Sequence, residues 1–303
     1  MTDQLKGTLI TLLGVLILTP DAALTRLIDI GSLSMTFWRA LGLVVVLAAL
    51  AAIRHGGRGA VRQVAASGLV GAVLVATFVV SQLSFVAAIK LTNPAHVLVL
   101  ISAAPLFGAL ASRLILGERL ATATAIAIAI GIAGIIVTAS AGFTEHADWR
   151  GDLAALVCAA CMGLNFTLIR RARLNDAWAH FAAAALINVT WIGLFVPVAL
   201  PGGPDLFNLI LLCAVIQPIA FALITVGPRY LTAPEVALLM LVEAPIGALI
   251  VWLVLAIAPA PHASVGGAIV LATIAVHAWW RLRRAPATAA QKSVAIPLTS
   301  QSP

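Results

Sequence analysis

Two stretches of this 303-residue chain resemble each other and decide its fold. Residues 91–105 read Leu-Thr-Asn-Pro-Ala-His-Val-Leu-Val-Leu-Ile-Ser-Ala-Ala-Pro, and residues 231–245 read Leu-Thr-Ala-Pro-Glu-Val-Ala-Leu-Leu-Met-Leu-Val-Glu-Ala-Pro. At an offset of 140 they share six identities in fifteen positions, more than chance expects even in a chain rich in alanine and leucine. A second match, at an offset of 144, pairs Lys6-Gly7-x-Leu9 with Arg150-Gly151-x-Leu153. The chain is therefore predicted to contain two related halves.

The composition places the chain in a membrane. Hydrophobic residues make up 62% of it and charged residues only 10%, with a mean hydropathy of +1.10. A soluble domain could not bury this much apolar surface. The net charge of +7 sits in short clusters between apolar segments, which is typical of membrane topology rather than of a nucleic-acid-binding surface. No nucleic-acid partner is expected.

The three cysteines, Cys158, Cys161 and Cys213, all lie inside apolar runs and indicate no disulfide framework. The Cys158-x-x-Cys161 pair is compatible with a redox or metal site, but no second pair or histidine cluster lies near it in the sequence. Packing of small residues in a membrane helix is the favoured interpretation. Neither a metal nor a cofactor is predicted.

Ten membrane-spanning helices are predicted, since about 20 apolar residues cross a bilayer core of roughly 30 Å. The expected spans are 5–27, 31–53, 63–89, 93–117, 121–142, 150–170, 177–200, 206–228, 233–257 and 263–282. Residues 7–19 also resemble the apolar region of a signal peptide, with Ala22 and Ala23 as a cleavage site, but the repeat favours a retained helix. The tail at 285–303 is expected to be disordered and cytoplasmic.

The basic residues predict the orientation, because short cytoplasmic loops collect lysine and arginine. With the N-terminus in the cytoplasm, three basic residues fall outside, namely Arg26, Lys90 and Arg150, while Arg39 falls inside a span. The other fourteen lie on the cytoplasmic side: Lys6, Arg54, Arg58, Arg62, Arg113, Arg119, Arg170, Arg171, Arg173, Arg229, Arg281, Arg283, Arg284 and Lys292. Both termini are therefore expected in the cytoplasm, and the asymmetry supports the count of ten.

Five spans in each half place the second half upside down relative to the first. The predicted units are a first five-helix repeat at 1–145 and a second, inverted repeat at 146–284. Inverted halves can expose a central site to each side of the membrane in turn, which favours a transporter. Pro105 and Pro245, at equivalent positions, are expected to kink their helices.

The chain resembles the EamA-type drug/metabolite transporters. The residues that carry this resemblance are Phe37-Trp38-Arg39-Ala40, Pro94, Ala104-Pro105 and the ending Leu116-Gly117-Glu118-Arg119-Leu120. The second half departs from the pattern, with Ile257-Ala258-Pro259 where Gly-Glu would stand. Within the superfamily the chain is similar to the YddG-type exporters of aromatic amino acids. The resemblance implies a bacterial inner-membrane exporter, and a central cavity formed by the first, third, fourth, sixth, eighth and ninth helices. The chain is expected to be a monomer.

Polar groups at membrane depth are costly and are therefore candidate site residues. Arg39 is expected either to reach the outer interface or to pair with a carboxylate such as Asp21. Polar residues and aromatic residues able to enclose an amino acid together form the predicted substrate site: Trp38, Phe78, Gln82, His96, Asn165, Gln217, Phe221 and Glu243. Helix-to-helix hydrogen bonding or packing explains each of them about as well.

Other function classes leave no motif in the sequence. The chain contains no His-Glu-x-x-His and no Gly-Lys dipeptide that could end a phosphate-binding loop. No catalytic residue is predicted, and an intramembrane enzyme or a channel is the alternative to a carrier of amino acids or of another small metabolite.

Overall fold

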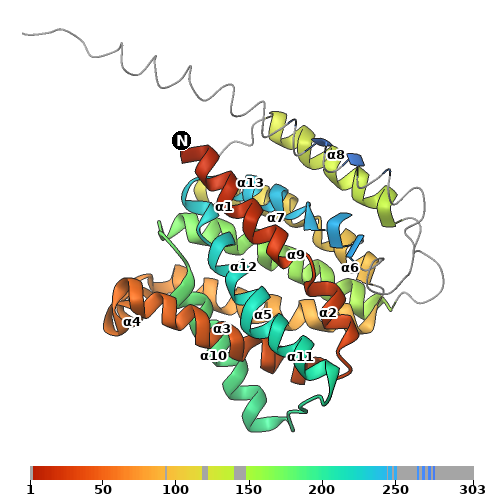
Figure 1. The fold of residues 1–303 in the computed structure, drawn as a ribbon. Coiled ribbons are helices and arrows are strands. Elements are labelled where there is room, and N and C mark those ends of the chain that lie inside the picture. The colour runs from red at the N-terminus through yellow and green to blue at the C-terminus, as the bar shows by residue number, and fades with distance from the viewer. Residues whose placement is uncertain are drawn as a thin grey trace, which may run out of the picture.

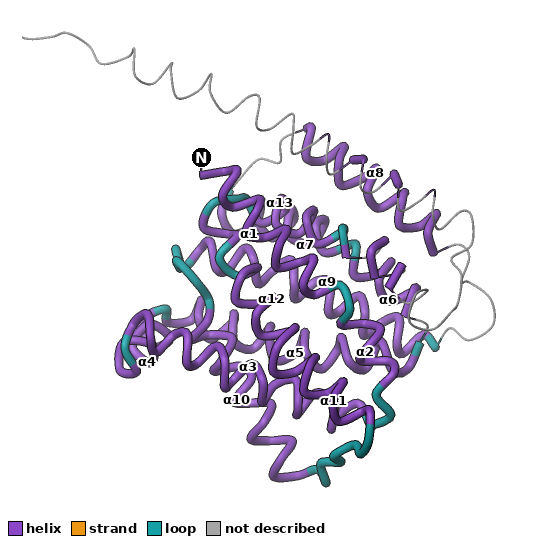
Figure 2. The backbone as a smooth tube through the Cα atoms, in the orientation of Figure 1, coloured by secondary structure: helices purple, strands orange, loops and turns teal. Residues whose placement is uncertain are grey.

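The structure is a computed structural model that describes residues 3–92, 94–117, 122–139 and 148–243, with short stretches at 245–247, 249–250, 265, 268–269, 272–273 and 276. Within these residues every regular element is helical (Figures 1 and 2). The predicted tail at 285–303 and most of the predicted span 263–282 lie outside the described residues.

Six helices in the described part are long and apolar enough to cross a membrane. The first combines α1 (Asp3–Leu18) with α2 (Asp21–Leu27), and α3 (Ser32–His55), α5 (Gly68–Leu91), α9 (Trp149–Arg171) and α10 (Trp178–Phe195) follow. The sixth runs from Pro204 to Arg229 through α11 (Pro204–Ile210), the π-helical η2 (Leu211–Ile216), α12 (Gln217–Ile224) and the short 3-10 helix η3 (Gly227–Arg229). Six of the ten predicted spans thus correspond to such helices.

Three more predicted spans contain helices that are not among these six. The fourth contains α6 (Pro94–Ile101), α7 (Ala104–Ala111) and the π-helical η1 (Ser112–Leu116). The fifth contains α8 (Thr122–Ala139), and the ninth begins with α13 (Ala233–Met240). Both proline-containing spans are interrupted rather than merely kinked, because α6 ends at Ile101 and α13 ends just before Leu241. Ile101 and Leu241 lie four residues before Pro105 and Pro245. The proline ring clashes with the backbone carbonyl at that position, and the proline nitrogen has no hydrogen to donate to it.

The predicted span 63–89 is wrong at its start. Residues 57–66 form a separate short helix, α4 (Gly57–Ala66), which has no buried residue. Gly68 has a φ of 54°, a left-handed conformation that favours glycine, and it marks the turn into α5. Arg58 and Arg62 lie four residues apart on α4, which suits a helix lying along a surface rather than inside a bilayer.

Helices from the two sequence halves pack directly against each other. The main pairs are α5 with α9, α3 with α10, and α1 with α12. The backbones of α7 and α9 approach closely, since a Cβ added at Gly163 would lie 2.5 Å from the amide nitrogen of Gly108. Large apolar side chains in mid-helix are left exposed, among them Leu13 at 53% and Val45 at 62%. Exposure of such side chains is what a lipid-facing surface requires.

Candidate binding cavity

A cavity of about 700 Å³, including its open mouth, lies among helices of both halves. Its walls come from the first span, α3, α5 and α6 on one side of the sequence, and from α9, α10, α12 and α13 on the other. Two of these helices, α3 and α10, were not among those predicted to form the cavity. They contribute Arg39 and Phe181. The cavity is therefore enclosed by more helices than expected.

A buried ion pair forms one end of the cavity. Both guanidinium NH2 groups of Arg39 donate to the carboxylate of Asp21, and one of them also donates to the Thr25 hydroxyl at 2.9 Å. Arg39 and Asp21 are each 2% exposed. The guanidinium also lies 5.0 Å from the ring centre of Phe85. The predicted pairing of Arg39 with Asp21 is confirmed, and the alternative of an arginine reaching the outer interface is wrong.

Local backbone chemistry places Asp21 in this pair. Pro20 cannot donate a hydrogen bond to the Leu16 carbonyl, and the helix breaks between α1 and α2. The Thr19 hydroxyl donates to that carbonyl instead, at 2.8 Å. Asp21 then begins α2 inside the bundle, where Arg39 of α3 reaches it.

Aromatic rings form the other end of the cavity. The rings of Phe78 and Phe181 stack with their centres 3.7 Å apart, and Phe221 meets Phe78 edge-on at 5.5 Å. Phe181 lies one turn from the start of α10. That start lies beside the C-terminal end of α3, as the contact between Arg54 of α3 and the Trp178 ring shows. Arg39 lies fifteen residues before Arg54 on the same helix, which corresponds to roughly 22 Å. The cavity is thus charged at one end and aromatic at the other.

Gln82 lies between these ends, since it stands between Phe78 and Phe85 on α5, and Asn165 lies beside the aromatic end. Gln217 donates to the Oε1 atom of Gln82 at 3.3 Å, and Thr77 donates to the Oδ1 atom of Asn165 at 2.5 Å. Among the described residues, the Nε2 atom of Gln82 and the Nε atom of Arg39 are buried without a hydrogen-bond partner. An unpartnered buried donor costs about 1–3 kcal/mol, so both groups favour an acceptor in the cavity.

Most of the predicted site residues meet at this cavity. Five of them line it, namely Phe78, Gln82, Asn165, Phe221 and Glu243. Gln217 lies behind the wall, where it contacts Gln82. The side chain of His96 lies outside the described residues.

Trp38 is placed elsewhere, and sequence reasoning missed Phe181. The indole N–H of Trp38 donates to the Ala199 carbonyl at 2.9 Å, in the loop after α10. Neighbouring helix positions point about 100° apart, so Arg39 faces the cavity while Trp38 does not. Phe181 stands in an alanine-rich helix, and nothing in its neighbourhood in the sequence distinguishes it from a lipid-facing residue.

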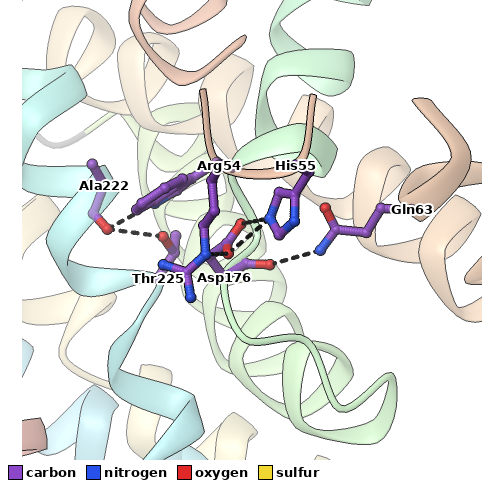
Figure 3. A network of polar contacts seen from close by, with 7 residues as sticks. Arg54, His55, Gln63, Asp176, Ala222 and Thr225 are labelled. Atoms are coloured by element: carbon purple, nitrogen blue, oxygen red, sulfur yellow. Dashed lines mark hydrogen bonds and ion pairs between the residues drawn. The ribbon is translucent and has the colours of Figure 1, made fainter. Parts of the chain in front are cut away.

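A network of polar contacts lies beyond the aromatic end (Figure 3). The Asp176 carboxylate is fully buried and lies 3.2 Å from Arg54 Nε and 3.1 Å from His55 Nε2. Gln63 of α4 donates to the Asp176 carbonyl at 3.5 Å. Next to it, the indole N–H of Trp178 donates to the Ala222 carbonyl at 2.9 Å. The network ties α3, α4, α10 and α12 together just outside the ring of phenylalanines.

These features define a multi-span helical membrane protein with an internal, largely apolar cavity. Residues 5–140 match the EamA-like transporter family, which supports the resemblance to the drug/metabolite transporter superfamily. Members of the matched family are membrane transporters of small substrates.

A solved crystal structure, described only as that of a protein, has the same fold. It matches with a TM-score of 0.76 over 92% of this chain and 98% of the other, at 20% sequence identity. At this identity the likeness concerns the fold alone. No curated protein matches the chain at a significant level.

Proposed function

We propose that the chain is a secondary transporter that exports neutral amino acids with aromatic or other hydrophobic side chains across the bacterial inner membrane. It would span the membrane ten times as two inverted repeats, with both termini in the cytoplasm, and work by alternating access. The observation that carries the proposal is a single cavity with an unpartnered donor on Arg39 at its charged end, a second one on Gln82 in its middle, and phenylalanine rings at its other end.

The two ends match the two parts of such a substrate. The free N–H groups of Arg39 and Gln82 can donate to a carboxylate, and Glu243 can accept from an ammonium group. An apolar side chain would then extend toward Phe78, Phe181 and Phe221, where aromatic packing contributes about 0.5–1.5 kcal/mol beyond area burial. Asn165 lines the cavity beside its aromatic end, where it can orient the side-chain part.

The cavity walls also fit the proposed mechanism. Because both sequence halves contribute to the walls, a rocking motion of one half against the other changes which end is open. The interruptions before Pro105 and Pro245 stand at equivalent positions of the two halves, so each half contains a helix able to bend beside the cavity.

A binding screen tests the substrate class. Thermal unfolding of the purified protein should shift upward with phenylalanine, tryptophan or leucine, and much less with aspartate or lysine, because only the former suit an apolar pocket. Replacing Gln82 with leucine removes the free donor, together with the acceptor of Gln217, and leaves a side chain of similar size, so we expect the apparent affinity to fall roughly tenfold.

Gln4→Leu is the matched control, since Gln4 lies at the start of α1 and does not line the cavity. The amino-acid assignment fails if none of the twenty amino acids stabilises the protein while another small metabolite does. Release of a chemically altered product would instead point to the alternative function, an intramembrane enzyme.

A further inference from the structure

A second, polar hollow lies outside the cavity, at the same end of the bundle as the Asp176 network. It encloses about 750 Å³, including its open side, between the turn that follows α9 and the turn that precedes α13. Arg170 and Arg173 line it from the first turn, and Arg229 and Tyr230 line it from the second. None of these residues lines the phenylalanine-rich cavity.

The hollow is strongly basic. Three arginines line it against one carboxylate, Glu235. That carboxylate is engaged in a capping box, where its Oε2 atom accepts from the Thr232 amide at 2.8 Å. Lys6 adds a fourth cation nearby, because its ammonium group lies 5.7 Å from the centre of the Tyr230 ring.

Two of these cations lie over the ring of Tyr230. The guanidinium of Arg229 lies 5.3 Å from the centre of the ring that Lys6 also approaches. Tyr230 is the only tyrosine in the chain, and it is partly buried. Tyrosines concentrate where a membrane meets water, at the depth of the lipid headgroups.

The backbone at Arg173 has an unusual conformation for an arginine. The amide of Arg173 donates to the Arg170 carbonyl at 3.0 Å, and the amide of Leu174 donates to the Ile169 carbonyl at 3.1 Å. This pattern ends a helix with a left-handed residue, which is usually glycine. Here Arg173 adopts a φ of 51°, so the turn carries a charged side chain at the hollow where glycine would be less strained.

We propose that this hollow binds the phosphate of an anionic phospholipid headgroup. Guanidinium groups bind phosphate oxygens in pairs of parallel hydrogen bonds, and Arg173 and Arg229 bring two of them to one hollow. Arg170 lines the same hollow and donates to the Leu231 carbonyl at 3.4 Å. The site lies at the ends of membrane-crossing helices, on the face that the basic residues predict to be cytoplasmic. Basic pockets between helices on that side are suited to anionic headgroups. The proposal rests on this membrane placement and is independent of which substrate is carried.

The test compares lipid binding to the purified full chain by native mass spectrometry. The variant Arg173→Gly combined with Arg229→Gln removes two pocket charges, and glycine relieves rather than adds strain at position 173. We expect phosphatidylglycerol to bind wild type in preference to phosphatidylcholine. Each lost arginine should weaken phosphatidylglycerol binding roughly fivefold, or roughly 25-fold for both.

Arg58→Gln combined with Arg62→Gln is the matched control, because it removes the same charge from α4 on the same face, away from the hollow. This control should retain wild-type binding. Equal losses in the two double variants would overturn the proposal in favour of a general surface charge effect. Equal binding of phosphatidylcholine, or competition by millimolar inorganic phosphate that abolishes the lipid complex, would overturn the lipid assignment.

Discussion

Replacing Arg39 with methionine is expected to lower the free energy of unfolding by about 3–5 kcal/mol, because it leaves Asp21 buried without a positive partner. The loss includes the hydrogen bond from Arg39 to Thr25. Equilibrium unfolding of the purified protein in mixed micelles, with increasing denaturing detergent, would measure it.

Two further variants separate burial of charge from loss of side-chain packing. Arg58→Met removes an exposed arginine of α4 and should change stability by no more than about 0.5 kcal/mol. Adding Asp21→Asn to Arg39→Met removes the isolated charge and should restore much of the lost stability. If Arg39→Met lowered the free energy of unfolding as little as Arg58→Met, the buried ion pair would not stabilise the fold.

Replacing Asp176 with alanine is expected to open the aromatic end of the cavity to water about tenfold more often. The fully buried carboxylate meets both Arg54 and His55, and hydrogen bonds to charged groups contribute about 1.5–3 kcal/mol. Because Arg54 is 40% exposed, we take the lower end of that range, which corresponds to a tenfold change in population. The result would appear as faster labelling of a cysteine placed at Thr225, which lines the cavity and is 1% exposed.

The labelling uses a membrane-impermeant maleimide and a background in which the three native cysteines are replaced by alanine. Asp205→Ala is the matched control, since Asp205 accepts from the Asp29 amide near the opposite end of the bundle. It should leave the labelling rate at Thr225→Cys unchanged. An unchanged rate in Asp176→Ala would mean that the polar network does not hold this end closed.

Apolar runs predicted the helix positions well, because a bilayer-crossing helix must be apolar throughout its length. The predicted starts of α3, α9 and α10 fall within one residue of the observed starts. Hydropathy could not separate α4 from α5, since Val64, Ala65 and Ala66 read as a continuation of the next apolar run. The repeat predicted which two helices are irregular. It predicted kinks rather than interruptions, because the sequence does not show how the carbonyls that the prolines leave without donors are accommodated.

The candidate site could be predicted only in part. Arg39, Gln82, Asn165 and Glu243 could be identified as charged or amide side chains in apolar surroundings, because burying a polar group at membrane depth is costly. Aromatic residues carry no such signal, since lipid and cavity accept them equally. Phe181 was therefore missed, and Trp38 was assigned to a site that its helix face does not reach.

Counterflow in proteoliposomes tests the central claim most directly. Vesicles containing the purified protein and loaded with unlabelled phenylalanine should take up labelled phenylalanine transiently and with saturation, and Gln82→Leu should require a higher concentration for the same rate. Saturable exchange of this kind is what a carrier with one alternately exposed cavity predicts. Uptake that is no faster than in protein-free vesicles, for all neutral amino acids, would contradict it.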